Sequence, residues 1–136
     1  ACHAALAPGG KIRLSTPNLA WVWATHDPAA ADAAEARRRT FVANRAFYGW
    51  EHRFLWTREL LAEALEACGF RDVHFAAYGE SADAAMRNLE QHERAPDAPG
   101  LEHVLIFEAE RSDFEPERFD ALLAAAREHF LLHLRG

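Results

Sequence analysis

The chain has little cysteine, no long apolar run and fewer basic than acidic residues. Its two cysteines, Cys2 and Cys68, stand in helical contexts rather than as a bridged or metal-binding pair, which fits a reducing cytoplasm. No apolar stretch approaches the roughly 18 residues that a membrane span needs. The formal net charge is −6, and no stripe of basic residues alternates with aromatics. Nucleic acids and membranes are therefore not expected as partners.

The motifs of several enzyme classes are also missing. There is no G-x-S-x-G elbow and no P-loop, so neither a nucleophilic hydrolase nor a nucleotide phosphotransferase is indicated. The eight histidines do not follow the spacing of an H-E-x-x-H motif or of paired His and Cys ligands. The residues available to a metal would be His52, His74, His92, His103, Glu80 and Glu93. We expect no metal site among them.

A turn and a strand that belong in the middle of a domain stand at the start of the chain. Residues 6–19 read LAPGGKIRLSTPNL, in which Pro8 presets φ for the first corner of a turn and Gly9 can take the positive φ of the second. Residues 1–6 are predicted to end a helix, and residues 11–15 to form a strand. An α/β domain does not normally begin this way, and no initiator methionine is present. We therefore expect this chain of 136 residues to be one domain or part of one.

Two central helices are predicted from their caps. Asp27 and Pro28 supply an N-cap and a first-turn proline for an alanine-rich helix that runs to about Phe47. Thr57 caps a second helix, which ends at Gly69. The apolar residues of this second helix form a one-sided stripe: Leu60, Leu61, Ala64, Leu65 and Cys68.

Two further strands and two further helices complete the predicted order. Residues 73–78 form a second strand, and the helical connection before it is long enough for a right-handed crossover, so a parallel sheet is expected. Residues 82–93 are predicted to form a short helix. Residues 103–109 contain an unbroken apolar run, which is typical of a strand that is buried on both faces. Residues 116–134 are predicted to form an amphipathic helix that packs on the sheet or on a partner.

Two groups of basic residues have simple structural interpretations. Lys11 and Arg13 alternate with apolar residues, which predicts a strand face that is partly solvated or covered by long aliphatic stems. The run from Arg37 to Arg39, near Glu35, predicts a solvated helix face.

This order of elements resembles the C-terminal half of a class I S-adenosylmethionine-dependent methyltransferase. In that family a Pro-Gly-Gly turn precedes the fifth strand, a helix before A-x-G-F-x-x-V precedes the sixth, and a seventh strand inserts antiparallel between them. The resemblance assigns these strands to residues 11–16, 73–78 and 104–109. It implies an α/β fold with a partial doubly wound, Rossmann-like sheet. The likeness covers roughly residues 1–110, and residues 111–136 follow as an amphipathic extension.

A narrower likeness involves the pattern NRAF…WGHxF…GES…LRGLE of short predicted bacterial methyltransferases. The matching segments are Asn44 to Phe47, Gly49 to Phe54, Tyr78 to Ser81 and Arg87 to Glu90. Glu51 and Asn88 each stand where the pattern has a glycine.

The resemblance implies S-adenosylmethionine as the cofactor of the intact protein, but the segment that binds it in the family is missing here. Glycines occur only at positions 9, 10, 49, 69, 79, 100 and 136, so no G-x-G-x-G loop exists. The first strands of such a sheet supply most of the cofactor site. We therefore expect this chain alone to bind the cofactor weakly or not at all.

Five residues are candidates for the acceptor side of the site. His52 has the side chain of a base or substrate hydrogen-bonding group, and Glu80 follows a strand at the carboxyl edge of the sheet; these two are the catalytic candidates. Asn18 at the same edge, with Trp50 and Arg53 in the aromatic loop, are the candidates for substrate binding. Since methyl transfer is an in-line displacement, alignment of the acceptor is the main task of these residues.

Each candidate also has a structural alternative. Asn18 can simply form a turn through an Asx hydrogen bond. Trp50, Phe54 and Trp56 can form a structural cap rather than a lid. Glu80 can form an ion pair or interact with a helix N-terminus.

The expected function is transfer of a methyl group to an unidentified small-molecule acceptor in the cytoplasm, with this chain supplying mainly the acceptor side. The alternative is a noncatalytic interaction or dimerisation module of the same fold. In either case the C-terminal amphipathic helix is a candidate for homodimer formation.

Overall fold

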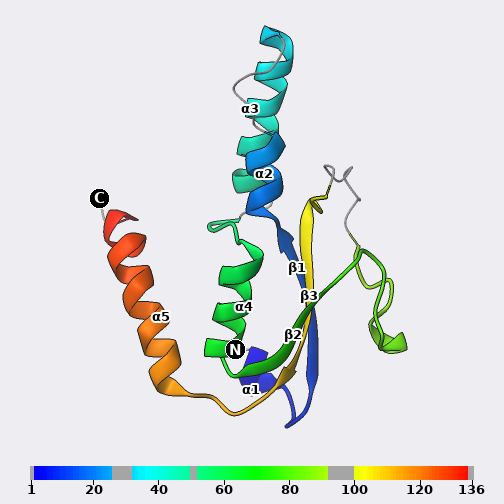
Figure 1. Ribbon diagram of the computed structural model, residues 1–136, viewed down its shortest axis with the longest axis vertical. Coiled ribbons are helices and arrows are strands. Elements are labelled where there is room, and N and C mark those ends of the chain that lie inside the picture. Colours follow the sequence, from blue (N-terminus) through cyan, green and yellow to red (C-terminus); the bar gives the residue numbers. More distant parts are fainter. Residues whose placement is uncertain (1, 26–31, 50–51, 92–99, 135–136) are drawn as a thin grey trace. The chain divides into compact units, whose positions relative to one another are not determined.

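The computed structural model describes residues 2–25, 32–49, 52–91 and 100–134 (Figure 1). Its α-helices are α1 (Cys2–Ala5), α2 (Leu19–Thr25), α3 (Ala33–Tyr48), α4 (Arg58–Ala67) and α5 (Pro116–His129), with short 3₁₀ turns η1 (Ala84–Met86) and η2 (Leu131–Leu134). The strands are β1 (Lys11–Pro17), β2 (Phe70–Ala76) and β3 (Val104–Arg111). The described part is thus an α/β chain with a small antiparallel sheet.

The sheet has the strand order β1-β3-β2. Arg111 donates its backbone N–H to Gly10 O (2.8 Å), and Asn18 donates its N–H to His103 O (3.1 Å), so β3 runs back along β1. On the other side of β3, Ser112 donates its N–H to Gly69 O (2.8 Å). β3 lies between β1 and β2 and runs antiparallel to both, so β1 and β2 run in the same direction, as the crossover predicted. They do not pair directly with each other, so the sheet itself is antiparallel and not parallel. The order of the three strands is the one that the resemblance implied.

β2 contains one extra residue relative to β3. Arg71 pairs with Glu110 and His74 pairs with Glu108, so a step of three residues in β2 matches a step of two in β3. Asp72 lies between these two residues and has a φ of 53°, as at a β-bulge. β2 begins at Phe70, before the predicted Val73, and ends at Ala76, before the predicted Tyr78.

The predicted entry into β1 is confirmed. Gly10 donates its N–H to Ala7 O (2.8 Å), which closes a turn with Pro8 and Gly9 at its corners. Gly9 has a φ of 72°, the conformation that the second corner requires. The turn thus joins α1 directly to β1.

Two predicted helices differ from the structure. The cap of α3 is Asp32, whose carboxylate accepts the N–H of Glu35 (2.9 Å), while Asp27 and Pro28 lie outside the described residues. The helix predicted over residues 82–93 was wrong for the described part, since only η1 forms there. Local caps compete with a longer helix at this position: Asp83 N–H donates to Ser81 Oγ (3.0 Å), and Asp83 itself accepts from Ala85 N–H (3.0 Å).

The other helices lie close to their predicted positions. α4 follows Thr57 and buries Leu61, Leu65 and Ala67. Gly69 follows α4 with a φ of 85°, as expected of a glycine that ends a helix. The tail helix α5 ends at His129, earlier than predicted, and η2 continues the tail.

The chain divides into two compact units, and each strand contributes to both. Unit 1 comprises residues 1–13, 59–74 and 108–136; unit 2 comprises residues 14–58 and 75–107. The predicted boundary at residue 110 does not coincide with this division. The buried apolar residues of unit 1 are Leu61, Leu65, Ala67, Phe70 and Ala109, and those of unit 2 are Val22, Leu55, Leu105, Ile106 and Phe107. β3 is buried along most of its length, as predicted.

Candidate functional site

The carboxyl ends of β1 and β2, where the candidate residues were expected, belong to unit 2. Asn18 immediately follows β1 and is only 4% exposed. Its Nδ2 donates to Glu102 O (2.9 Å), and its Oδ1 accepts the N–H of Ala20 (3.0 Å). Asn18 therefore caps α2 and attaches it to the segment before β3. Its amide is engaged by the main chain, as the structural alternative predicted.

The second half of the aromatic loop packs beside this cap. The Phe54 and Trp56 rings meet edge to face, with centroids 4.7 Å apart. Leu55 between them is 5% exposed. Trp56 O accepts the N–H of Leu19 (3.0 Å), which fixes the loop to the start of α2. This part of the loop is a structural cap, whereas Trp50 lies outside the described residues.

The three charged or titratable candidates are not joined to one another. His52 is half-buried, and Arg53 and Glu80 are exposed. Within the described ranges, no hydrogen bond or ion pair links Glu80 to His52 or Arg53. The structure therefore does not bring these three candidates together in a hydrogen-bonded group.

The segment after β2 is a closed loop, and the residues of the GES…RNLE pattern close it. Gly79 donates its N–H to Glu90 Oε2 (3.1 Å), and Asn88 donates its N–H to Gly79 O (3.1 Å). A Cβ on Gly79 would stand 2.8 Å from Asn88 Oδ1. Asn88 has a φ of 55°, a left-handed conformation that glycine and asparagine adopt more readily than other residues. Glu80 is presented at the surface of this loop.

Two features of unit 2 were not predicted from the sequence. The Arg58 guanidinium lies 4.4 Å from the centre of the Phe75 ring and donates to Glu102 Oε2 (3.1 Å). Trp21 Nε1 is buried and has no hydrogen-bond acceptor in the described part of the chain. The Trp21 ring meets His103 edge to face at 6.3 Å. An unsatisfied buried donor is uncommon, and the sequence carried no signal for it.

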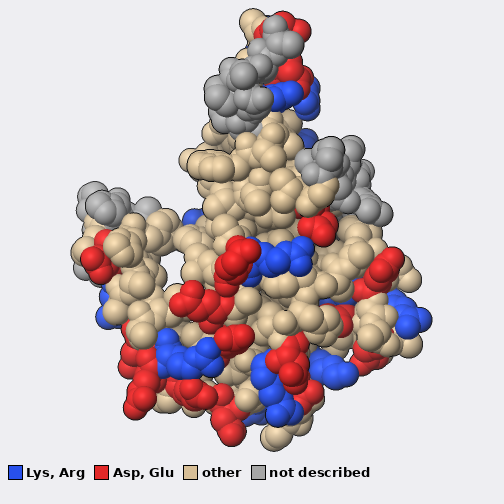
Figure 2. Space-filling view, viewed as in Figure 1, with Lys and Arg blue, Asp and Glu red and all other residues tan. Residues whose placement is uncertain are grey.

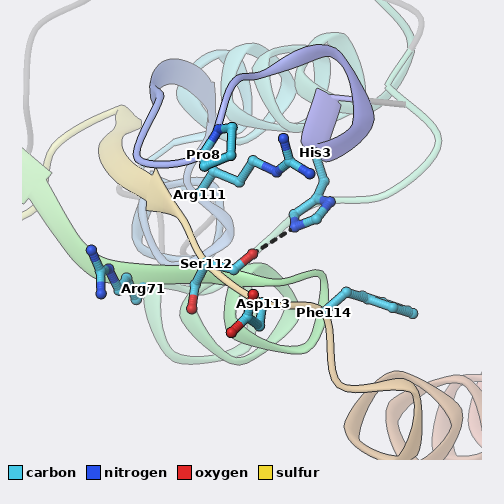
Figure 3. Close-up of a pocket in the computed structure, with 7 residues that line it drawn as sticks. All are labelled: His3, Pro8, Arg71, Arg111, Ser112, Asp113 and Phe114. Atoms are coloured by element: carbon cyan, nitrogen blue, oxygen red, sulfur yellow. Dashed lines mark hydrogen bonds between the residues drawn. The ribbon is translucent and has the colours of Figure 1, made fainter.

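A cavity of about 330 Å³ lies in unit 1 (Figure 3). It is lined by His3, Pro8, Arg71, Arg111, Ser112, Asp113 and Phe114. His3 Nε2 donates to Ser112 O (2.8 Å), so α1 is held against the end of β3.

The basic groups of this cavity already have partners within the fold. Arg71 pairs with Glu110, and this contact raises the pKa of Arg71 and lowers that of Glu110. The Arg111 guanidinium donates to Leu6 O. Arg71 and Arg111 therefore make contacts within the fold, and the cavity does not offer two unpaired guanidinium groups to an anionic ligand.

No three His, Cys, Asp or Glu side chains of the described part of the chain are grouped so that they could hold a metal ion. His92 and Glu93, two of the candidate ligands, lie outside it. No helix in the described ranges is long and apolar enough to cross a bilayer.

Comparison with known proteins found no matching family model, no matching curated protein and no matching solved structure. The functional interpretation of the chain rests on its own residues and their arrangement.

Proposed function

We propose that this chain is the acceptor-side part of an S-adenosylmethionine-dependent methyltransferase that acts on a small molecule. The observation that carries this proposal is the order β1-β3-β2, with antiparallel pairing of β3. The turn at Pro8 and Gly9 before β1, and the helix end at Gly69 before β2, stand where the resemblance requires them. The strand order and the two connections that lead into β1 and β2 together support a relationship with the methyltransferase sheet.

In this proposal the cofactor supplies an electrophilic methyl group, and this chain supplies residues that bind or align the acceptor. No glycine-rich loop follows β1 or β2, and the amide of Asn18 is hydrogen-bonded to the main chain. In the loop after β2, Gly79 donates its N–H to Glu90 Oε2 and its carbonyl accepts the N–H of Asn88. These observations favour an acceptor-side role for the chain.

In the proposed site, Asn18 is a positioning residue, because it fixes α2 and the aromatic loop at the carboxyl end of β1. His52 and Glu80 are the catalytic candidates, and Arg53 with Trp50 the substrate-binding candidates. A half-buried histidine in this loop can accept a proton from an O or N acceptor as the methyl group is transferred. The exposed Glu80 carboxylate can orient a polar acceptor.

The test is a methyl-transfer assay with radiolabelled S-adenosylmethionine and a library of small hydroxylated and amino compounds, using the product of the complete reading frame. Loss of a general base costs about 10²–10⁴ in rate, so His52→Ala should reduce kcat by at least about 10²-fold. His129→Ala is the matched control, because that side chain is 76% exposed on α5. Absence of transfer to every compound, together with absence of cofactor binding, would reject the proposal.

A noncatalytic interaction module is the second candidate. It is favoured by α5, a helix of 14 residues with an apolar stripe and no buried residue. This observation concerns association and is compatible with either function.

A further inference from the structure

The apolar stripe of α5 is incompletely covered. Its members share one face of the helix by their spacing of three and four residues: Phe119, Leu122, Leu123, Ala126 and Phe130. Each of them is half-buried, and none of the helix is buried. Within unit 1, Phe119 meets Phe114 at 5.7 Å, and Arg118 donates to Glu66 Oε2 (2.8 Å). These contacts hold the start of α5, and Leu122, Leu123 and Ala126 farther along the stripe are only half-buried.

One edge of this stripe carries two opposite charges. Asp120 and Arg127 are seven residues apart, so they lie on the same side of the stripe, two turns from each other. Both are exposed, and neither forms an ion pair within the described ranges. Figure 2 shows acidic and basic side chains close together on the visible surface, without a large area of one sign.

We propose that α5 pairs with α5 of a second copy of this chain, in antiparallel orientation, with the midpoint between Leu123 and Ala124. In this register Asp120 of each copy faces Arg127 of the other, so the symmetric contact contains two ion pairs. In an antiparallel pair, the edge that carries Asp120 and Arg127 faces the same edge of the other helix. In a parallel pair, it would face the opposite edge of the other helix. The charge pattern is therefore self-complementary only in the antiparallel arrangement.

Side-chain size supports the same register. Phe119, near one end of the stripe, falls between Ala126 and Phe130 of the second copy, so a large ring meets a small residue.

A second copy fits this surface better than an unrelated partner because the pattern complements itself. Antiparallel pairing about one midpoint is an isologous contact, which closes as a dimer and does not extend into a filament. The proposal concerns a surface of unit 1 and is independent of the methyltransferase proposal, because every residue it uses lies in the tail or beside it.

The test is the mass in solution of the 136-residue chain and of charge-reversed variants, measured by sedimentation equilibrium. We expect a dimer. Asp120→Arg and Arg127→Asp should each raise the dissociation constant about tenfold, since each places like charges at both symmetric contacts. The double variant Asp120→Arg/Arg127→Asp should recover the original dissociation constant. Glu128→Arg is the matched control, because Glu128 is 74% exposed on the opposite face and should change nothing.

A second set of variants addresses the apolar contact. Leu123→Asp should give a monomer with an unchanged near-ultraviolet circular dichroism spectrum, which shows that unit 1 still folds. A monomeric parent chain at 100 μM would overturn the proposal. A dimer in which the two single charge reversals have no effect, or in which the double variant fails to recover, would overturn it equally.

Discussion

The Arg13 guanidinium donates to the Glu108 carboxylate over 2.5 Å, between β1 and β3, and the two side chains are only 3% and 6% exposed. His74 Nε2, on β2, donates to the other oxygen of Glu108 at 3.0 Å. One buried carboxylate therefore links all three strands within unit 1. The face of β1 that was predicted to be solvated or covered by aliphatic stems carries a buried ion pair at Arg13.

Removal of one member of this pair should be costly. Glu108→Leu leaves the buried Arg13 guanidinium without its carboxylate, and we expect the free energy of unfolding to fall by about 3–5 kcal/mol. The double variant Arg13→Met/Glu108→Leu should recover most of this loss, because apolar replacement of a whole buried pair is often neutral. Urea denaturation of the three proteins checks both statements. A double variant as unstable as the single one would show that Glu108 acts through other contacts.

Gly79→Ala should destabilise the loop after β2 for two reasons, backbone conformation and crowding. Gly79 has a φ of 77°, and an added Cβ would stand 2.8 Å from Asn88 Oδ1. Gly100 is a matched control, since its φ is 73° and no atom lies within 4 Å of its added Cβ. We expect Gly100→Ala to cost about 1 kcal/mol and Gly79→Ala to cost more. Equal losses in thermal denaturation would show that Asn88 does not approach Gly79 closely.

Asn18→Ala should reduce stability rather than act on an acceptor directly. The variant removes the cap of α2 and the hydrogen bond to Glu102 O, and we expect a loss of about 1–2 kcal/mol. Asn18→Asp keeps the capping oxygen but places a buried carboxylate oxygen against Glu102 O, so it should be at least as destabilising as Asn18→Ala. Differential scanning calorimetry gives the order of the three proteins. Unchanged stability of Asn18→Ala would restore Asn18 as a substrate-binding candidate.

Acid should weaken the first turns of α3. Hydrogen bonds from Arg38 and then Arg39 lower the pKa of Glu35 from 4.5 to about 2. A lowered pKa in the folded state means that ionised Glu35 stabilises the helix above pH 4.5, and that this contribution is lost as the pH falls towards 2. Two-dimensional NMR of the amides in α3 should report this loss, and Glu35→Gln should abolish the transition. A carboxyl titration of Glu35 near pH 4.5 would contradict the expectation.

The elements that could be predicted from the sequence are those with a local cause. The turn at Pro8 and Gly9 follows from residue conformation, and α4 follows from its apolar stripe and its terminal glycine. The buried run in β3 follows from composition. Each signal lies within a few residues, so no tertiary information was needed.

The features that were missed depend on contacts between distant segments. The bulge at Asp72 depends on the pairing of β2 with β3. Instead of the helix predicted over residues 82–93, the described part forms a loop that Gly79 and Glu90 close. Asn18 donates to Glu102 O, 84 residues away, and this capping contact could not be predicted from the local sequence.

The central proposal, that this chain supplies the acceptor side of a methyltransferase, is tested most directly by equilibrium dialysis with radiolabelled S-adenosylmethionine. Two proteins are compared, residues 1–136 alone and the product of the complete reading frame. We predict micromolar binding by the complete product and none by residues 1–136 at the same concentration. Micromolar binding by residues 1–136 alone, or no binding by the complete product, would contradict the account.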